Sequence, residues 1–331
     1  MTNKCVLVLP YFGAFKNYFP LFLRTCEANP SFDWLLVTDI STVPSLPANV
    51  YLLHMSLEEL RLRACGKFGI EASLSTPFKL CDYKPSYGLL FEEEIASYDY
   101  WGHCDCDLLF GDLSTIVGPI LDEGYDKIFA LGHLTLYRND FQVNRLFMSE
   151  FRGGYPYRDY LMSPKPFAFD EDGPCPNRPS WRNIHVMFLE GGRKVFCKDL
   201  SMNTLTTCDW IARTVFDPDT HSFVNDLTPR RYYWSEGKLL SLEPGEGDSL
   251  VRREYSYMHL QGRKMRMGSE IIGAKYVEVL PDRFRAVSGL PSNLRELRLS
   301  AVKFSRMRPL DQLQAKVGRH LPKISFNREV K

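Results

Sequence analysis

The N-terminal third of the chain alternates short, continuous apolar runs with amphipathic segments. The apolar runs predict buried strands at residues 4–9, 32–38 and 50–55. Between the first two, residues 17–26 carry a helical pattern with Pro20 in the first turn. A second helix is predicted over residues 56–68, where Ser56 and Glu59 have the spacing of a capping box. This alternation predicts an α/β fold with a central mixed, mostly parallel sheet flanked by helices.

The remainder of the chain continues the pattern less regularly. A further helix is predicted over residues 85–97. Additional strands are predicted at residues 127–131, 194–197, 231–234 and 238–241. Residues 152–183 are rich in Gly, Pro, Tyr and Asp and predict a long functional loop. Because the periodicity weakens beyond Gly268, we expect one main domain over residues 1–268 and a C-terminal extension over residues 269–331.

Composition is that of an ordinary globular protein, with 44% apolar and 24% charged residues. No apolar run approaches the roughly 20 residues needed to cross a bilayer. The apolar start at residues 5–9 runs straight into a Pro-aromatic-Gly turn and predicts a first strand rather than a signal peptide. The nine cysteines are an odd number without C-x-x-C pairs, which favours free thiols in a reducing compartment. We therefore expect a cytoplasmic protein.

Charge is distributed unevenly along the chain. Residues 283–331 contain 12 Lys and Arg against 3 Asp and Glu, a net charge of +9, whereas the preceding residues carry 29 basic and 37 acidic side chains, a net charge of −8. Leu310, Leu313, Val317 and Leu321 have helical spacing in this basic extension. The extension could be solvated, could dock on the acidic body, or could hold the protein against an anionic membrane surface. No nucleic-acid partner is expected, because the cations are not interleaved with aromatic residues.

The acidic triplet Asp105-Cys106-Asp107 is the most informative feature of the sequence. It follows an aromatic segment that starts at Tyr98 and predicts a strand, and it precedes the apolar run 108–110. Two carboxylates at a strand end suit Mg²⁺ or Mn²⁺, which take oxygen ligands together with substrate phosphates. A surface turn is the alternative. Zinc on the neighbouring C-x-C is disfavoured, because the sequence offers no second cysteine pair.

A second candidate motif lies in the segment from Tyr257 to Met265. It combines an extended aromatic stretch with His259 and a following cation pair, Arg263 and Lys264. A neutral imidazole is a good Mn²⁺ ligand, and the two cations would reach a diphosphate held by that metal. The alternative is a histidine in a basic surface segment.

Several other polar residues follow predicted strands or precede predicted helices, where a substrate would bind. Acidic residues at strand ends accept hydrogen bonds from a ribose, lysines neutralise a diphosphate, and a glycine permits close approach. Structural turns, caps or a buried histidine explain the same residues equally well or better. These candidates for donor binding are Asp39, Lys79, Asp82, Lys84, Gly132 and His133.

The long loop contains three consecutive acids that include Asp170 and Glu171. Acidic runs of this kind are usually solvated turns. A carboxylate held in a cleft, however, can remove a proton from an acceptor hydroxyl. We therefore regard these two residues as candidates for a general base.

Taken in order, these motifs resemble GT-A-fold glycosyltransferases, in particular a bacterial family found in capsule, O-antigen and lipooligosaccharide loci. The resemblance covers most of residues 5–265. At Cys106 the chain departs from the family pattern, in which an apolar residue is commoner. We do not expect this departure to disturb the two carboxylates. The blocks that carry the resemblance span residues 10–39, 79–93, 98–112, 125–139, 169–171 and 259–265.

The resemblance implies a GT-A catalytic domain over residues 1–268 and does not extend beyond it. The charge of the extension over residues 269–331 suggests contact with a membrane or an acceptor. The resemblance implies a nucleotide-diphosphate sugar donor, with a UDP-sugar first, and a glycan or lipid-linked acceptor. It also implies a divalent cation, Mn²⁺ or Mg²⁺, on Asp105 and Asp107, with His259 resembling the closing metal ligand of such enzymes. The protein would then work in the cytoplasm, peripherally on the inner face of the membrane.

The stereochemical course stays open. If the reaction inverts the anomeric centre, Asp170 is our first candidate for the base and Glu171 the second; a retaining reaction needs no such base. Two other classes of function fit the same carboxylate pair. One is a metal-dependent phosphoesterase or nucleotidyltransferase, and the other is a non-catalytic module that binds nucleotides or glycans.

Overall fold

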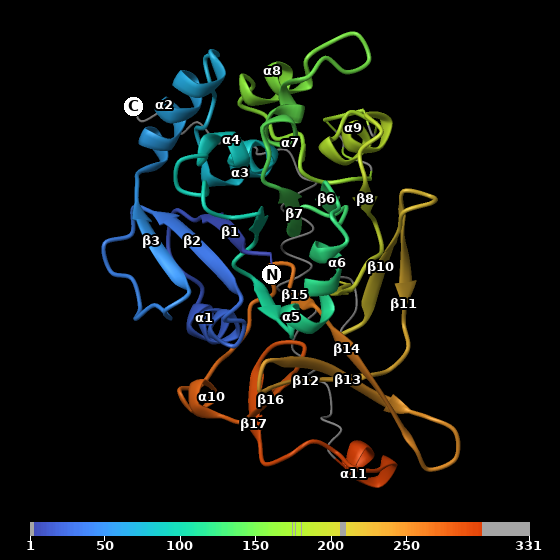
Figure 1. Cartoon of the computed structure of the whole chain (residues 1–331). Helices are drawn as coiled ribbons and strands as arrows, with labels where there is room; N and C mark the ends of the chain where they lie inside the picture. The colour runs from blue at the N-terminus through green and yellow to red at the C-terminus, as the bar shows by residue number, and fades with distance from the viewer. Residues whose placement is uncertain (1–2, 174, 176, 180, 206–209, 300–331) are drawn as a thin grey trace, which may run out of the picture.

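The computed structural model describes residues 3–173, 175, 177–179, 181–205 and 210–299. Its central element is a seven-stranded sheet in the order β3-β2-β1-β4-β7-β6-β8 (Figure 1). The strands are β1 Cys5–Pro10, β2 Phe32–Thr38, β3 Val50–His54, β4 Tyr100–Cys104, β6 Lys127–Ile128, β7 Leu134–Arg138 and β8 Val195–Phe196. β1 pairs in parallel with β2 and β4, and β2 with β3, whereas β7 is antiparallel to both of its neighbours. The predicted α/β fold with a mixed, mostly parallel sheet is confirmed.

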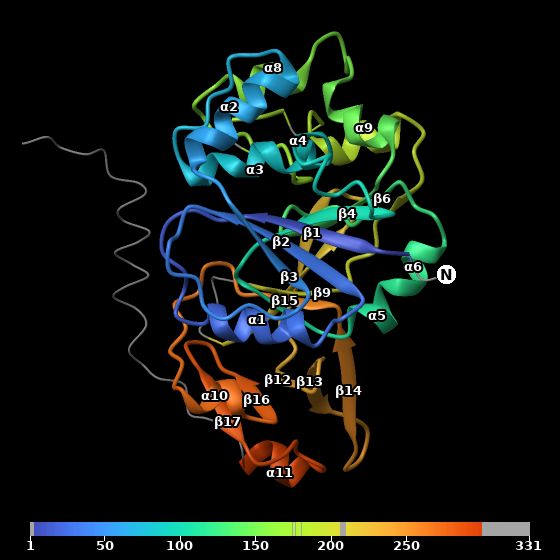
Figure 2. The ribbon, with the colours of Figure 1, turned by 60° about the vertical axis from the view of Figure 1, so that its left-hand side comes forward.

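Helices cover both faces of this sheet (Figure 2). One face carries α2 Leu57–Phe68, α3 Leu80–Tyr83, α4 Tyr87–Leu90, α7 Phe141–Arg145, α8 Pro156–Leu161 and α9 Ile184–Glu190, and the other carries α1 Phe19–Glu27, α5 Leu113–Ile116 and α6 Gly118–Asp122. Strand β1 shows why the sheet needs both layers. Val6 and Val8 pack into one core, whereas Cys5, Leu7 and Leu9 pack into the other.

The two predicted N-terminal helices form for the reasons that the sequence indicates. Helix α1 has Pro20 in its first turn, where the missing N–H is harmless. Helix α2 begins with the predicted capping box: Ser56 Oγ accepts from Glu59 N at 3.2 Å, and the Glu59 carboxylate accepts from Ser56 N at 2.7 Å. The helix ends at Gly69, whose φ of +63° gives the left-handed conformation of a helix C-terminus.

Two antiparallel-rich sheets that the sequence did not predict complete the fold. The second sheet has the order β11-β10-β9-β15-β5, and the third has the order β14-β13-β12-β16-β17. The strands of the second sheet are β5 Leu108–Phe110, β9 Ser201–Thr204, β10 Arg213–Asp217, β11 Ser222–Asp226 and β15 Tyr257–His259. Those of the third are β12 Arg231–Ser235, β13 Lys238–Pro244, β14 Leu250–Tyr255, β16 Tyr276–Val279 and β17 Phe284–Val287.

The third sheet crosses the domain boundary that the sequence suggests at residue 268. Strand β16 pairs with β12 and with β17, so residues on both sides of the boundary share one sheet. Helices α10 Glu270–Gly273 and α11 Leu294–Leu299 also follow residue 268. The rest of the predicted basic extension, including its apolar residues at helical spacing, lies outside the described residues.

Some predicted elements are shorter than the sequence pattern suggests. Within residues 85–97, the regular α-helix is confined to α4, because Phe91 leaves helical geometry with a φ of −116° and a ψ of 28°. Strand β6 ends at Ile128, because Phe129 adopts a φ of +72°. The long loop over residues 152–183 contains helix α8. In the described part of the chain no helix is long and apolar enough to cross a membrane, and eight cysteines are free thiols.

Candidate active site

The acidic triplet is the point at which the chain passes from the first sheet to the second. Strand β4 ends at Cys104 and β5 begins at Leu108, so Asp105 and Asp107 occupy the junction. The β4–β7 register pairs Cys104 with Leu134, and the next residue, Asp105, donates its backbone N–H to His133 O at 3.0 Å. Two independent sheets therefore fix the backbone of the triplet.

Strand pairing brings His259 to the same place from far along the sequence. His259 is the last residue of β15 and pairs with Leu108 of β5, which is the residue after Asp107. Its Nε2 lies 3.5 Å from Asp107 Oδ1, and Gly262 N donates to Asp107 Oδ2 at 2.7 Å. One ligand atom from each of Asp105, Asp107 and His259 lies within 4.8 Å of the others. The three predicted metal ligands thus converge, and two carboxylates with one imidazole suit a divalent cation such as Mn²⁺.

Asn203 orients the imidazole and was missed by the sequence analysis. It lies on β9, directly opposite His259 in the parallel β9–β15 pairing. His259 Nδ1–H donates to Asn203 Oδ1 at 3.1 Å, and Gln261 Nε2 donates to the same oxygen at 2.8 Å. The Nε2 atom is thereby directed towards Asp107, as in metal sites where a second group fixes the orientation of the histidine. No motif announces Asn203, because its role depends on a long-range strand pairing.

Asp107 and His259 shift each other's pKa values. Burial raises the pKa of Asp107, but the hydrogen bond and charge of His259 lower it more, so the net pKa lies below the usual value. Burial likewise lowers the pKa of His259, but Asp107 raises it more, so the net pKa lies above the usual value. A proton on His259 therefore balances Asp107, and a bound cation would take the place of that proton.

Lys84 joins the metal-ligand cluster to the predicted catalytic loop. Its Nζ lies 2.9 Å from Asp105 Oδ1 and 3.0 Å from Asp170 Oδ2, and it donates to Gly132 O at 2.8 Å. Burial lowers the pKa of Lys84, but the two carboxylates raise it more, so the side chain stays charged. All three ammonium protons have acceptors within the protein. Lys84 therefore holds Asp105 and Asp170 rather than reaching for a donor phosphate.

Asp170 is buried beside this lysine and is 3% exposed. Its Oδ1 has no hydrogen-bond partner among the described residues. Burial raises its pKa, and Lys84 partly opposes that effect. Gly132 provides the space for the carboxylate, because a Cβ on Gly132 would lie 2.2 Å from Asp170 Oδ2. The predicted donor-binding glycine thus makes room for a predicted catalytic residue.

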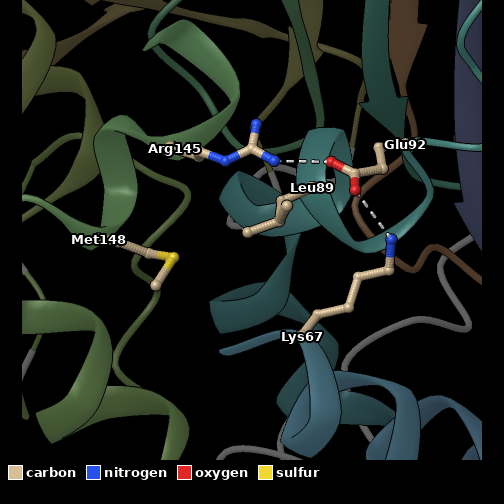
Figure 3. A pocket seen from close by; sticks show the side chains of 5 residues that line it. All are labelled: Lys67, Leu89, Glu92, Arg145 and Met148. Carbon is tan, nitrogen blue, oxygen red and sulfur yellow. Dashed lines mark hydrogen bonds and ion pairs between the residues drawn. The ribbon is translucent and has the colours of Figure 1, made fainter. Parts of the chain in front are cut away.

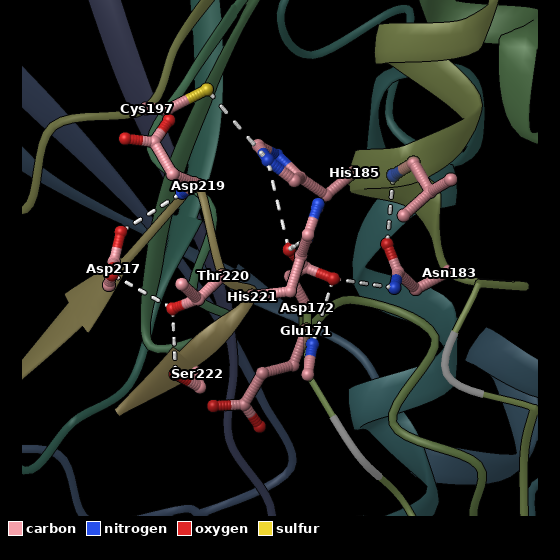
Figure 4. Close-up of polar contacts among 12 residues, drawn as sticks. Glu171, Asp172, Asn183, His185, Cys197, Asp217, Asp219, Thr220, His221 and Ser222 are labelled. Atoms are coloured by element: carbon pink, nitrogen blue, oxygen red, sulfur yellow. Dashed lines mark hydrogen bonds and ion pairs between the residues drawn. The ribbon is translucent and has the colours of Figure 1, made fainter. Parts of the chain in front are cut away.

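Glu171, the second candidate base, presents a different carboxylate. Its side chain is partly exposed, and no hydrogen bond or ion pair joins it to another described residue. Figure 4 draws it apart from the polar contacts made by the next residue, Asp172. Burial of its surroundings and the charge of Asp170 raise the pKa of Glu171 to about 7. A carboxyl group with such a pKa can exchange protons near neutral pH.

Lys79 and Asp82 lie away from the cluster and support it. They form a buried ion pair at 2.6 Å, with side chains 1% and 0% exposed. Lys79 Nζ donates to the carbonyl oxygens of Tyr160 at 2.7 Å and of Lys165 at 2.5 Å. Asp82 accepts from the backbone N–H groups of residues 167 and 169. The structure does not bring this pair to a donor; it fixes the segment that leads into Asp170.

The remaining candidates are dispersed around the cluster. His133 is buried, its ring centroid lies 4.3 Å from that of His259, and its Nδ1 is hydrogen-bonded to Tyr257 OH at 2.9 Å. Asp39 is exposed at the end of β2, where the parallel strands share one edge with the triplet. Arg263 is 7% exposed, and its guanidinium donates to Leu205 O at 2.6 Å, so it does not point to a diphosphate. Lys264 is exposed.

A separate surface pocket of about 400 Å³ lies among α2, α4 and α7 (Figure 3). Lys67, Leu89, Glu92, Arg145 and Met148 line it. Glu92 lies between the two cations of the lining, 3.3 Å from Lys67 Nζ and 2.9 Å from an Arg145 nitrogen. None of the candidate site residues lines this pocket.

Comparisons with known proteins add a family and a partial structural likeness. A model described as "Family of unknown function (DUF6625)" matches residues 7–288. No curated protein matches the chain. A crystal structure of the galactosyltransferase LgtC with donor and acceptor sugar analogues is 12% identical, with a TM-score of 0.31, 61% of this chain covered and 76% of that chain covered. A structure of an active-site mutant of LgtC is 10% identical, with a TM-score of 0.33 and coverages of 61% and 75%.

Proposed function

We propose that this chain, which belongs to the family of unknown function DUF6625, is a metal-dependent glycosyltransferase. It would move a sugar from a nucleotide-diphosphate donor, first a UDP-sugar, to a glycan or lipid-linked acceptor of the bacterial surface. The observation that carries the proposal is the convergence of Asp105, Asp107 and His259 at a sheet junction. The resemblance of the motifs to surface-polysaccharide glycosyltransferases supports the donor class and the pathway.

The residues present fit a divalent cation. Two carboxylates and an imidazole with a fixed tautomer form a mixed oxygen and nitrogen ligand set, which favours Mn²⁺ and also accepts Mg²⁺. When bound there, the cation would stabilise negative charge on the departing diphosphate. Asp105 and Asp107 would hold it, and Asn203 would keep His259 Nε2 in position.

The protein's own groups on the other side of the cluster would act on the sugars. Lys84 favours the ionised form of Asp170 and fixes its Oδ2, whereas Oδ1 is buried, so we assign Asp170 a positioning role beside the reacting groups. Glu171 is the better general base if the reaction inverts, because its carboxylate is partly exposed and its pKa of about 7 matches neutral conditions. This choice reverses the order expected from the sequence, and the reason is the anchoring of Asp170 by Lys84.

Thermal stability measured with a panel of ligands tests the proposal and identifies the class of donor at the same time. Mn²⁺ and UDP-, GDP-, CMP- and dTDP-sugars would be added to the wild-type protein and to Asp105→Asn and Asp107→Asn. A ligand at 100 times its Kd stabilises the fold by about 2.7 kcal/mol. We expect a Mn²⁺-dependent shift with one nucleotide class in the wild type and in the control Asp248→Asn, an exposed residue of the β13–β14 turn, and no shift in the two site variants.

Turnover then separates the classes of function. Release of the nucleotide with transfer of the sugar supports the glycosyltransferase, and both site variants should lose it. Release of inorganic phosphate alone would point to the phosphoesterase. Nucleotide binding that survives a chelator, without turnover, would point to a binding module. Normal turnover of Asp105→Asn or Asp107→Asn at saturating Mn²⁺ would refute the metal assignment.

A further inference from the structure

The β10–β11 hairpin lies beside the loop that carries Asp170 and Glu171. It is the outer edge of the second sheet and extends along one side of the molecule (Figure 1). Residues 222–225 of β11 are all exposed. Neither the proposed metal site nor the proposed donor contacts use this hairpin.

His221, at the tip of the hairpin, is hydrogen-bonded to Asp172 in the loop that carries Asp170 and Glu171, called here the catalytic loop. Its Nδ1–H donates to Asp172 Oδ2 at 2.6 Å (Figure 4). The same carboxylate accepts from Asn183 Nδ2 at 2.9 Å and from Gly173 N at 2.8 Å, and it is 1% exposed. His221 adopts a φ of +51°, which is unfavourable for a residue with a side chain and is maintained here by this contact. The hairpin and the loop are therefore fixed relative to each other.

Phe223 presents an aromatic face next to that loop. Its Cε2 lies 4.0 Å from the position that a Cβ on Gly173 would take. The ring packs edge-on against Phe216, with centroids 5.5 Å apart, yet the residue is 41% exposed. Phe216 in turn packs with Ala130 and Leu131, which precede the Gly132 of the candidate active site. The exposed ring of Phe223 is thus connected, through Phe216, to the residues that precede Gly132 in the candidate active site.

Of the two apolar residues on β11, only Phe223 faces the loop that carries Asp170 and Glu171. Phe223 pairs with Phe216, and its neighbour Val224 pairs with Val215. Successive side chains of a strand point to opposite faces, so Val224 faces away from Phe216 and the catalytic loop. Val224 is 57% exposed. It is therefore a matched control: an exposed apolar residue on the same strand that faces the other side.

We propose that the β10–β11 hairpin is the acceptor side of the site and that Phe223 stacks on a pyranose ring of the acceptor. This inference rests on the proposed function. One face of a pyranose carries C–H groups, which pack on an aromatic ring, and its hydroxyls remain available for polar contacts. The edge of the Phe223 ring lies close to the loop at Gly173, so a sugar stacked on the exposed face of the ring would lie next to Glu171. The His221–Asp172 hydrogen bond holds the hairpin, and with it Phe223, in a fixed position relative to the Glu171 carboxylate.

Transfer to two soluble glycosides, octyl β-glucoside and octyl β-galactoside, tests the platform in the full chain. We expect Phe223→Ala to raise the acceptor KM about tenfold and to lower the ratio of transfer to donor hydrolysis by a similar factor. Phe223→Trp should restore both values, and Val224→Ala should match the wild type. His221→Ala should also raise the acceptor KM, because it releases the hairpin from the loop.

The possible failures are distinguishable. If the wild type neither binds nor turns over any nucleotide sugar, the proposed function fails, and the acceptor assignment fails with it. If the wild type hydrolyses a donor but transfers to neither glycoside, or if Phe223→Ala keeps the acceptor KM of Val224→Ala, only the acceptor platform is overturned. A KM increase in both Phe223→Ala and Val224→Ala would indicate general damage to the hairpin and would also overturn it.

Discussion

Replacing Gly132 by alanine tests the arrangement of the site with a single methyl group. The added Cβ would lie 2.2 Å from Asp170 Oδ2, whereas ordinary van der Waals contacts begin at 3.4 Å. The backbone of Gly132 is not in the left-handed region, so an alanine can adopt the same backbone conformation. The substitution therefore tests the contact with Asp170 alone. Since the Lys84 ammonium and the surrounding core leave little free space, the carboxylate must retreat by roughly 1 Å.

A retreat of this size has a calculable effect. Misplacement of a positioning group by about 1 Å costs on the order of 10²-fold in rate, which corresponds to about 2.7 kcal/mol of activation free energy. Crowding of the core should cost about 1–3 kcal/mol of unfolding free energy. The Mn²⁺-dependent thermal shift should persist, because Asp107 and His259 keep their partners.

Nucleotide release from the sugar donor that gives the largest thermal shift provides the assay. Gly118→Ala is the matched control, because a Cβ there meets no heavy atom within 4 Å. Turnover is compared at equal folded fraction, which separates the catalytic loss from the loss of stability. If Gly132→Ala turned over within about threefold of Gly118→Ala, the position of Asp170 would not matter to the reaction and the reasoning would be refuted.

Two further predictions concern the residues around the cluster. Asn203→Ala should weaken Mn²⁺ binding by roughly 10- to 100-fold, because the imidazole of His259 loses its fixed orientation; calorimetric titration with Mn²⁺ measures this, and an unchanged affinity would contradict it. Glu171→Gln should remove the rise of kcat towards pH 7 and lower kcat by roughly 10²- to 10⁴-fold, and a retained kcat would favour a retaining reaction or Asp170 as the base. Because the folded pKa of Glu171 exceeds its usual value of 4.5, stability should fall as pH rises from about 4.5 to 7 in the wild type and less so in the variant.

The local elements of the fold were predictable because each has a local cause. Helix α2 follows from the capping box at Ser56, and β2 follows from the mostly apolar segment over residues 32–38. The two antiparallel-rich sheets were predicted only in part. The strands β12 and β13 were predicted, but the pairings that assemble the sheets, such as β12 with β16 and β9 with β15, join segments that are distant in sequence. Strand β11, for example, is exposed over residues 222–225, and its two apolar residues, Phe223 and Val224, point to opposite faces.

The candidate site, like the fold, was predictable only in part. Chemistry and the family resemblance together pointed to Asp105, Asp107 and His259 as candidate metal ligands, because carboxylates at a strand end and a histidine near cations suit such a site. Their distances depend on the β5–β15 register, which no local pattern encodes. Arg263 was expected at the diphosphate for its charge, yet its guanidinium serves the carbonyl oxygen of Leu205. The sequence states which groups are present, but packing decides which of them face the substrate.

The charge balance of the site is compatible with the proposed divalent cation. Asp105 and Asp170 share the positive charge of Lys84, and Asp107 faces His259, whose raised pKa favours the protonated ring. A cation that replaced this proton would add one further positive charge without disturbing Lys84. Since the ammonium of Lys84 is fully occupied within the protein, it cannot neutralise a departing diphosphate. That task would fall to the bound cation and to the exposed Lys264, so metal removal should lower turnover more than substitution of Lys264 does.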